Sequence, residues 1–191
     1  SIAHTACLPI AGSQLTNDLA RVLRCPWEAA EHLKCTVGAA YADSSMHETV
    51  EIQAFGTQAK KSVDVRHVCE ILQARSEEIL EMVAVELKRV GYYDRLAAGL
   101  VLTGGTSQLR GFPDVAEARL GIPARLGQPA RYSGLSDLIG TPAFSTSIGL
   151  VEYALSGRER VLESAGGPSF EVPVGGLFRR LASFGRALMP Q

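Results

Sequence analysis

The alternation of apolar and polar positions divides the chain into short strands and turns. Residues 2–10 are mostly apolar and end at Pro9 and the Ala11-Gly12 turn, which predicts a strand. Residues 48–55 alternate between polar and apolar side chains over most of their length, a pattern typical of a half-buried strand. After a turn at Gly56, residues 60–65 are expected to pair back and complete a hairpin. Two further strands are predicted at residues 98–103 and 124–126.

Helical periodicity accounts for most of the remaining sequence. The N-cap candidates Thr16-Asn17-Asp18 predict a first helix that runs to Leu23, and Pro26 predicts the start of a second that ends near Gly38. The second helix is expected to place Trp27, Ala30 and Leu33 on one face. The longest helix is predicted over 65–90, with a repeat close to 3.6 residues formed by Val68, Leu72, Ile79, Met82, Val83 and Leu87. Shorter helices are predicted at 113–120 and 142–156, and strands that alternate with helices indicate an α/β fold.

The composition changes near the end of the chain. Residues 163–176 are rich in glycine and proline and poor in large apolar side chains, which predicts a flexible linker. The final stretch, LFRRLASFGRALMPQ, separates an apolar face from an arginine face when its residues are placed at about 100° intervals. The segment contains no acidic residue, and at roughly 20 Å it is too short to cross a bilayer. The pattern favours an interfacial helix on an anionic membrane, and the alternative is a helix that docks on the body of the protein.

The bulk composition excludes several classes of function. With 191 residues, 46% hydrophobic content and a net charge of −1, the chain is expected to have a packed core, and a general nucleic-acid binder would be more basic. The four cysteines lack the C-x-x-C spacing and the four histidines lack the H-E-x-x-H spacing of metal sites, so no metal site is predicted. The sequence has no apolar run of about 18 residues that would span a bilayer.

The sequence LVLTGGTSQLRGFPD, residues 100–114, carries the main chemical signal. A predicted strand ends at Gly104-Gly105 and a helix follows. Such a pair is compatible with a tight turn that requires positive φ, and equally with a nucleotide that lies against a backbone without side chains. Glu31 and Lys34 leave the same two possibilities open, because an i, i+3 pair on a helix can be a surface ion pair or part of a binding site.

Four segments together resemble a known family. AAGLVLTGGTSQL, residues 97–109, resembles the adenosine-motif strand and turn of the actin/Hsp70 superfamily, and in particular the FtsA family of bacterial cell-division proteins. The segments LTNDLA (15–20), AEHLK (30–34) and STSIGL (145–150) match the same family in order and spacing. The resemblance covers nearly the whole chain. It implies the second half of an actin-like (ribonuclease H-like) ATPase fold, with an inserted outer α/β subdomain, a flexible linker and a C-terminal amphipathic helix.

The resemblance also implies a division of the chain and a set of nucleotide-binding residues. The expected parts are the inner subdomain at 1–24 and 96–160, the outer subdomain at 25–95, the linker at 161–176 and the membrane-targeting helix at 177–191. ATP is the implied cofactor. Gly104 and Gly105 would pack against the adenosine and the α-phosphate, with Thr106 and Gln108 nearby. Glu31 and Lys34 would lie beside adenine and ribose. Gly12 and Thr16 would lie near the phosphates.

Catalysis is expected to depend on residues outside this chain. In the superfamily two Asp-Gly hairpins hold Mg²⁺ and surround the γ-phosphate, and neither is present here. The second hairpin is expected just before Ser1. We therefore predict that these residues alone neither hydrolyse ATP nor bind it tightly, with Mg²⁺ held mostly by the other half. In the family, ATP binding with weak or no hydrolysis serves assembly.

The family implies a scaffold at the division septum, on the cytoplasmic face of the membrane. Its partners would be the FtsZ C-terminal tail, bound by the outer subdomain at about residues 37–93, later division proteins, and further copies in filaments. Membrane binding is expected from Leu177, Phe178, Arg179, Arg180, Leu181, Phe184, Arg186 and Leu188. The alternatives are an actin-like ATPase enzyme or chaperone, and another actin-like scaffold of the rod-shape or pilus-assembly type.

Overall fold

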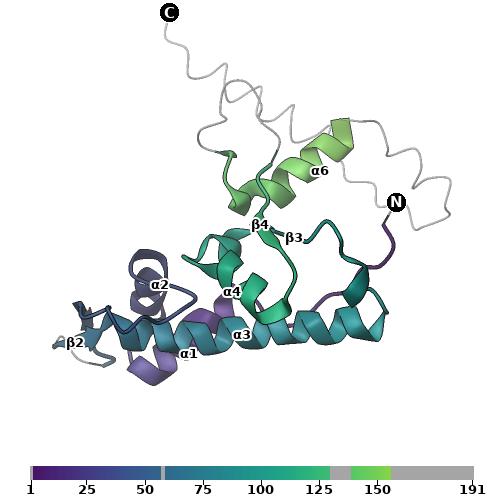
Figure 1. The fold of residues 1–191 in the computed structure, drawn as a ribbon. Helices are drawn as coiled ribbons and strands as arrows, with labels where there is room; N and C mark the ends of the chain where they lie inside the picture. The colour runs from purple at the N-terminus through teal and green to yellow at the C-terminus, as the bar shows by residue number, and fades with distance from the viewer. Residues whose placement is uncertain (1, 57–58, 130–138, 156–191) are drawn as a thin grey trace, which may run out of the picture. The chain divides into compact units, whose positions relative to one another are not determined.

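The computed structural model describes residues 2–56, 59–129 and 139–155. The predicted linker (161–176) and the predicted membrane-binding segment (177–191) lie outside the described residues. The chain divides into two compact units, residues 1–149 and 150–191, and each is considered by itself. Figure 1 shows the elements of the first unit arranged along one long helix.

The first unit alternates helices and short strands in an α/β arrangement. Its helices are α1 (Gly12–Leu23), α2 (Trp27–Thr36), α3 (Val65–Arg89) and α4 (Phe112–Leu120), and α6 (Ser145–Leu155) begins in it. Its strands are β1 (Thr49–Gln53), β2 (Lys60–Asp64), β3 (Leu100–Leu102) and β4 (Ala124–Leu126). Short 3-10 helices are η1 (Tyr93–Arg95), η2 (Gly105–Gln108) and η3 (Pro142–Phe144). The predicted hairpin, long helix and edge strand at 124–126 are confirmed.

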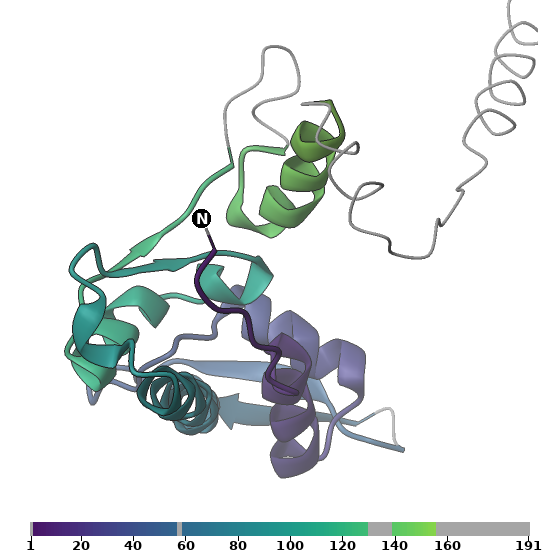
Figure 2. The same cartoon turned by 90° about the vertical axis from the view of Figure 1, so that its right-hand side faces the viewer.

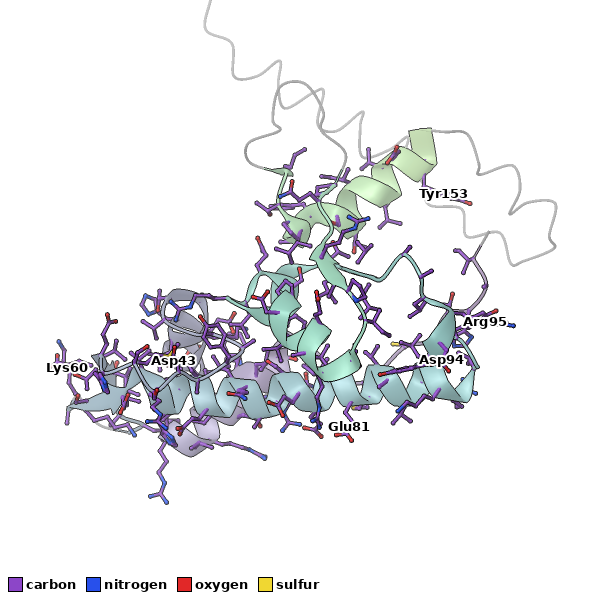
Figure 3. All side chains as sticks on the ribbon, in the orientation of Figure 1. Asp43, Lys60, Glu81, Asp94, Arg95 and Tyr153 are labelled. Atoms are coloured by element: carbon purple, nitrogen blue, oxygen red, sulfur yellow. The ribbon has the colours of Figure 1, made fainter. Side chains whose placement is uncertain are left out.

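Two small sheets connect these helices. β1 and β2 form the antiparallel hairpin, in which Thr49 lies opposite Asp64. β3 and β4 are parallel, with Leu100 opposite Ala124, and α4 makes the crossover between them. Figure 2 looks along α3 and shows α1 and α4 on different sides of it. Figure 3 shows Lys60 at the hairpin end of the unit and Asp94 and Arg95 near the opposite end of α3.

Helix α3 buries a row of residues spaced by four. Val68 and Leu72 pack with Leu15 and Leu19 of α1, whereas Leu80 packs with α4. Of the residues in the predicted helical repeat, Val68 and Leu72 are buried, whereas in the C-terminal half Ile79 and Val83 are half-buried and Leu80 and Ala84 are buried. The i+4 row of a helix is inclined to its axis, so the buried row moves around α3 between its two neighbours.

Three other features of the fold differ from the prediction. Residues 2–10 form no strand, because a strand requires a paired neighbour and none of the described strands pairs with this segment. Helix α1 begins at Gly12, so Thr16 is an interior helical residue and not an N-cap. Trp27 is 48% exposed and does not share the burial of Ala30 and Leu33.

Within the described residues, no helix is both long and apolar enough to cross a membrane.

Candidate functional site

The N-terminus of α1, the helix α2 and the turn η2 surround one cavity of about 640 Å³. Its lining includes six of the eight residues predicted to bind a nucleotide, namely Gly12, Glu31, Lys34, Gly105, Thr106 and Gln108. Thr16 is fully buried behind the lining and is hydrogen-bonded to two of these side chains. Gly104 is outside the lining and forms the N-cap of η2. The structure therefore brings together residues that are up to 96 positions apart in the sequence (Gly12 to Gln108).

The two glycines of the turn differ in whether the backbone conformation requires a glycine. Gly104 has φ of +87°, a conformation that disfavours any side chain. Its N–H donates to the carbonyl of Pro142 at 3.0 Å, and the Ser107 hydroxyl donates to its carbonyl at 2.8 Å. Gly105 has no positive φ, and a Cβ there would meet no protein atom within 4 Å. Packing between the described residues therefore does not require glycine at 105.

The turn and the start of α1 approach each other closely. A Cβ on Gly12 would lie 2.6 Å from Thr106 Oγ1, so only a glycine fits at this position without displacing Thr106. Gln14 Oε1 accepts a hydrogen bond from the Ala11 N–H at 2.9 Å and fixes the entry to the helix. The first N–H groups of a helix lack intrahelical acceptors and favour anions. At α1 these groups belong to residues that border the cavity.

A partly buried polar network of Lys34, Glu31 and Thr16 forms another part of the site. Lys34 Nζ donates to Glu31 Oε2 at 2.6 Å, to Thr16 Oγ1 at 2.8 Å and to the Gly12 carbonyl at 3.3 Å. Thr16 Oγ1 donates to Glu31 Oε2 at 2.5 Å. The Lys34 and Glu31 side chains are 16% and 34% exposed. This pair is therefore not an ordinary surface ion pair, because it is linked through a buried hydroxyl to the N-terminus of α1.

The network keeps Glu31 ionised. Burial acts to raise the pKa of Glu31, but the hydrogen bonds from Lys34 and Thr16, together with the charge of Lys34, outweigh it and lower the pKa below its usual value. Both donors use Oε2, whereas Oε1 accepts only a thiol hydrogen bond from Cys35 at 3.6 Å. Burial and the neighbouring carboxylate raise the pKa of the Cys35 thiol. Glu31 therefore presents an ionised oxygen that can accept hydrogen bonds from ligand hydroxyls.

The segment that begins at Ser145 is hydrogen-bonded to the residue that precedes the glycine turn. The hydroxyl of Thr103, the residue before Gly104, donates a 2.6 Å hydrogen bond to the hydroxyl of Ser145. Ser145 begins the segment STSIGL, which resembles the same family as the segment that contains the turn. The hydrogen bond between these two motifs helps to hold η2 at its place in the cavity wall.

Sequence reasoning missed several lining residues. Trp27, Cys35 and Arg110 all border the cavity. Arg110 follows the glycine turn by only five positions, and its proximity in sequence was an available signal. Trp27 was assigned to a buried helix face, so its exposure at the cavity rim could come only from the tertiary structure. Among the described residues no group of three or more His, Cys, Asp and Glu side chains lies close enough together to hold a metal ion.

Comparison with known families shows what the chain is similar to. Residues 1–149 match the family described as cell division protein FtsA. The chain is 39% identical over 156 residues to the cell division protein FtsA of Pseudomonas aeruginosa, which covers 81% of this chain and 37% of that protein. It is 32% identical over 161 residues to FtsA of Escherichia coli strain K12, with 80% and 38% coverage. The chain thus spans little more than a third of the length of these relatives.

Solved structures give the fold. MreB5 of Spiroplasma citri bound to ADP superposes with a TM-score of 0.59 at 12% identity, covering 84% of this chain and 48% of that chain. The same protein bound to AMPPNP gives a TM-score of 0.60 at 14% identity, covering 82% of this chain and 47% of that chain. At this identity the likeness establishes an actin-like fold.

Proposed function

The chain belongs to the FtsA family of cell division proteins, and on this premise we propose that its cavity binds the adenosine side of ATP. In the proposed complex, Gly104 and Gly105 lie against the nucleoside and the α-phosphate, with Thr106 and Gln108 beside them. Glu31 and Lys34 lie at adenine and ribose. Gly12 and the start of α1 face the phosphates, and Thr16 positions the ion pair. The observation that carries the proposal is the convergence of six of these eight residues on one cavity of about 640 Å³, a volume typical of small-molecule sites.

The groups in the wall suit recognition more than cleavage. Lys34 has three N–H donors, and all three are used within the protein, so it orients Glu31 and the helix start. In the proposed complex, Glu31 Oε1 accepts a hydrogen bond from a ribose hydroxyl, because within the described residues its only hydrogen bond comes from the Cys35 thiol at 3.6 Å. A bound ATP brings the phosphoryl group whose transfer depends on Mg²⁺ and on donors around the γ-phosphate. We propose that this wall serves nucleotide-dependent assembly and that it does not hydrolyse ATP by itself.

A glycine series tests the nucleotide site. Gly105→Ala and Gly105→Val add one and three carbons to a wall where the protein itself makes no contact within 4 Å, so they block the ligand and leave the fold intact. Gly149→Val is the matched control, because a Cβ there also meets nothing and Gly149 is outside the cavity. ATP is titrated into the 191-residue chain while amide chemical shifts are followed. We expect saturable shifts centred on Gly12 and Thr106, with a Kd on the order of 1 mM.

The series predicts a graded loss of ATP binding. Gly105→Val should weaken binding by at least about tenfold and Gly105→Ala by less, whereas Gly149→Val should leave it unchanged. Equal affinity in all variants would refute the assignment of this wall. A micromolar Kd for the chain alone would keep the site but refute the prediction that tight binding requires further residues.

We further propose that the protein acts as an adaptor at the division septum. It would tether FtsZ polymers, through their C-terminal tails, to the inner face of the cytoplasmic membrane, recruit later division proteins and associate into filaments. Membership of the FtsA family supports the division role, and the actin-like fold supports filament formation. Membrane attachment would come from residues 177–191, which lie outside the described residues.

Vesicle sedimentation tests the membrane attachment. The chain with and without residues 177–191 is mixed with vesicles that contain anionic or only neutral lipid. We expect the intact chain alone to sediment with anionic vesicles, and binding should fall when Arg179, Arg180 and Arg186 are replaced together by Gln. Equal sedimentation of both chains would refute this part of the proposal.

A further inference from the structure

Arg110 lines the cavity of about 640 Å³ at the C-terminal end of helix α2. The cavity follows this helix from Trp27, its first residue, to Gly38, two residues beyond its last. The helix has 10 residues and is roughly 15 Å long, so a nucleotide can lie along it. Cys35 and Gly38 line the same end of the cavity as Arg110.

The main chain fixes Arg110 at this end. The Ala40 N–H donates to the Arg110 carbonyl at 2.8 Å, and Ala39 and Arg110 form a parallel β-bridge. Ala39 and Ala40 are both fully buried, so Arg110 is anchored to the core. Its Nη2 donates to the carbonyl of Val37, the C-cap residue of α2, at 3.4 Å. The guanidinium therefore lies beside the last turn of α2.

The charge of Arg110 is not neutralised by a carboxylate. Arg110 is exposed, and none of the ion pairs formed by the described residues uses it. Lys34, the other basic residue of the lining, is instead paired with Glu31. The N–H groups of Arg110 contact the Val37 carbonyl and the buried Cys69 thiol. Because these contacts use the edge of the guanidinium, its flat face is free to meet a ligand.

The helix ends at the cavity have opposite polarity. The start of α1, at Gly12, presents N–H groups that favour phosphate. The end of α2 presents carbonyl groups that carry partial negative charge and disfavour phosphate. Residues 105–110 approach α2 at this end, as the contact between Arg110 and Val37 shows, so a flat base fits between two walls there.

We propose that Arg110 recognises the nucleobase, with its guanidinium stacked on the face of a purine. This inference rests on the proposed nucleotide site and adds a base-recognition residue to it. Arginine suits the task because its planar, delocalised cation is attracted to aromatic faces. A purine offers a larger face than a pyrimidine, so Arg110 favours purine nucleosides.

Two partial ligands separate the base from the phosphates. Adenosine carries the base and the ribose without charge, whereas inorganic triphosphate carries only the charge. Each is titrated into the 191-residue chain while amide chemical shifts are followed. Stacking on a base is lost when the stacking residue is replaced by alanine, so Arg110→Ala should weaken adenosine binding about five- to tenfold. Its affinity for triphosphate should be unchanged.

Two further variants separate stacking from charge. Arg110→Tyr keeps a flat face and loses the charge, so it should bind adenosine nearly as well as the wild type. Arg110→Lys keeps the charge and loses the flat face, so it should bind adenosine as weakly as Arg110→Ala. A general packing defect would not be rescued by tyrosine. Arg95→Ala is the matched control, because Arg95 is exposed in η1 outside the cavity and should have no effect.

Several results would overturn the proposal. They are the absence of saturable adenosine binding, equal adenosine affinity of Arg110→Ala and the wild type, and rescue by lysine but not by tyrosine. Loss of triphosphate binding in Arg110→Ala would assign the arginine to the phosphates. Loss of adenosine binding in Trp27→Ala, with Arg110→Ala unaffected, would place the base at the other end of α2.

Failure of this inference is distinguishable from failure of the nucleotide site. If Gly105→Val weakens ATP binding while Arg110→Ala binds adenosine as the wild type does, the site stands and the role of Arg110 is refuted. If Gly105→Val leaves ATP binding unchanged, the site itself is refuted, and the role of Arg110 with it.

Discussion

Replacement of Thr16 by valine removes the hydroxyl at the centre of the polar network. Thr16 is fully buried, donates to Glu31 Oε2 and accepts from Lys34 Nζ. A hydrogen bond to a charged group contributes about 1.5–3 kcal/mol. Lys34 and Glu31 remain paired at 2.6 Å, and solvent reaches the 34% exposed Glu31 side chain, so part of this is recovered. We expect a loss of about 2 kcal/mol in the free energy of unfolding, less than the sum of two such bonds.

The assay is thermal unfolding followed by circular dichroism. For a domain of this size, about 2 kcal/mol corresponds to a fall of roughly 4–8 °C in melting temperature. Thr16→Ser keeps the hydroxyl and loses one methyl group, so it should cost only about 1 kcal/mol. Thr36→Val is the matched control, because the Thr36 hydroxyl bonds only to the carbonyl of His32 on an exposed surface, and it should cost less than about 0.5 kcal/mol.

The acid dependence gives a second measure of the same network. The pKa of Glu31 is lowered in the folded chain, so its contribution to stability is present above its unfolded pKa and is lost as the pH falls through the folded pKa. In Thr16→Val this dependence should shrink, because one of the hydrogen bonds that lowers the pKa is gone. If Thr16→Val melts with the wild type, or if Thr36→Val costs as much, the network does not stabilise the fold as argued.

Three further predictions concern stability outside the cavity. Leu72→Ala should cost about 2–5 kcal/mol in urea unfolding, because Leu72 is fully buried, and a loss below 1 kcal/mol would show that this part of the core collapses around the gap. Arg75→Ala should lower the free energy of unfolding by about 1–2 kcal/mol, because Arg75 forms a partly buried ion pair that links α3 to Asp18 of α1. Arg66 forms an exposed ion pair, so Arg66→Ala should lower it by at most about 0.5 kcal/mol. Equal losses would contradict this distinction between the two pairs. Hydrogen bonds from Arg89 and His4 lower the pKa of Glu86 to about 2, so the contribution of Glu86 to stability is present above pH 4.5 and is lost toward pH 2. In Glu86→Gln, stability should depend less steeply on pH in that window. An unchanged dependence would refute the pairing.

Local sequence signals predicted the elements that depend on neighbours in the chain. The hairpin follows from alternating polar and apolar residues before a turn at Gly56, and the edge strand at Ala124–Leu126 agrees with the prediction residue for residue. The glycine turn was predictable because glycine readily adopts positive φ, and Gly104 has φ of +87°. The strand predicted at residues 2–10 was wrong because apolar content alone does not provide a pairing partner.

The candidate site was only partly predictable. The resemblance named six of the residues that line the cavity, but nothing in the sequence places Thr16 behind Glu31 and Lys34 as a buried link. The exposed position of Trp27 at the cavity rim was also not predictable, since its spacing with Ala30 and Leu33 indicates burial. Periodicity describes a face of a helix but does not say what covers that face.

The sequence by itself determined the α/β class, the family and the turn at Gly104-Gly105, because propensities, turn chemistry and motif spacing act over a few residues. Only the tertiary structure decided which row of α3 is buried, that Gly12 meets Thr106, and that Arg110 lies beside the end of α2. These features depend on contacts between segments far apart in the chain. Their energies come from burial and from charges brought within a few ångströms, and neither is set before the chain has folded.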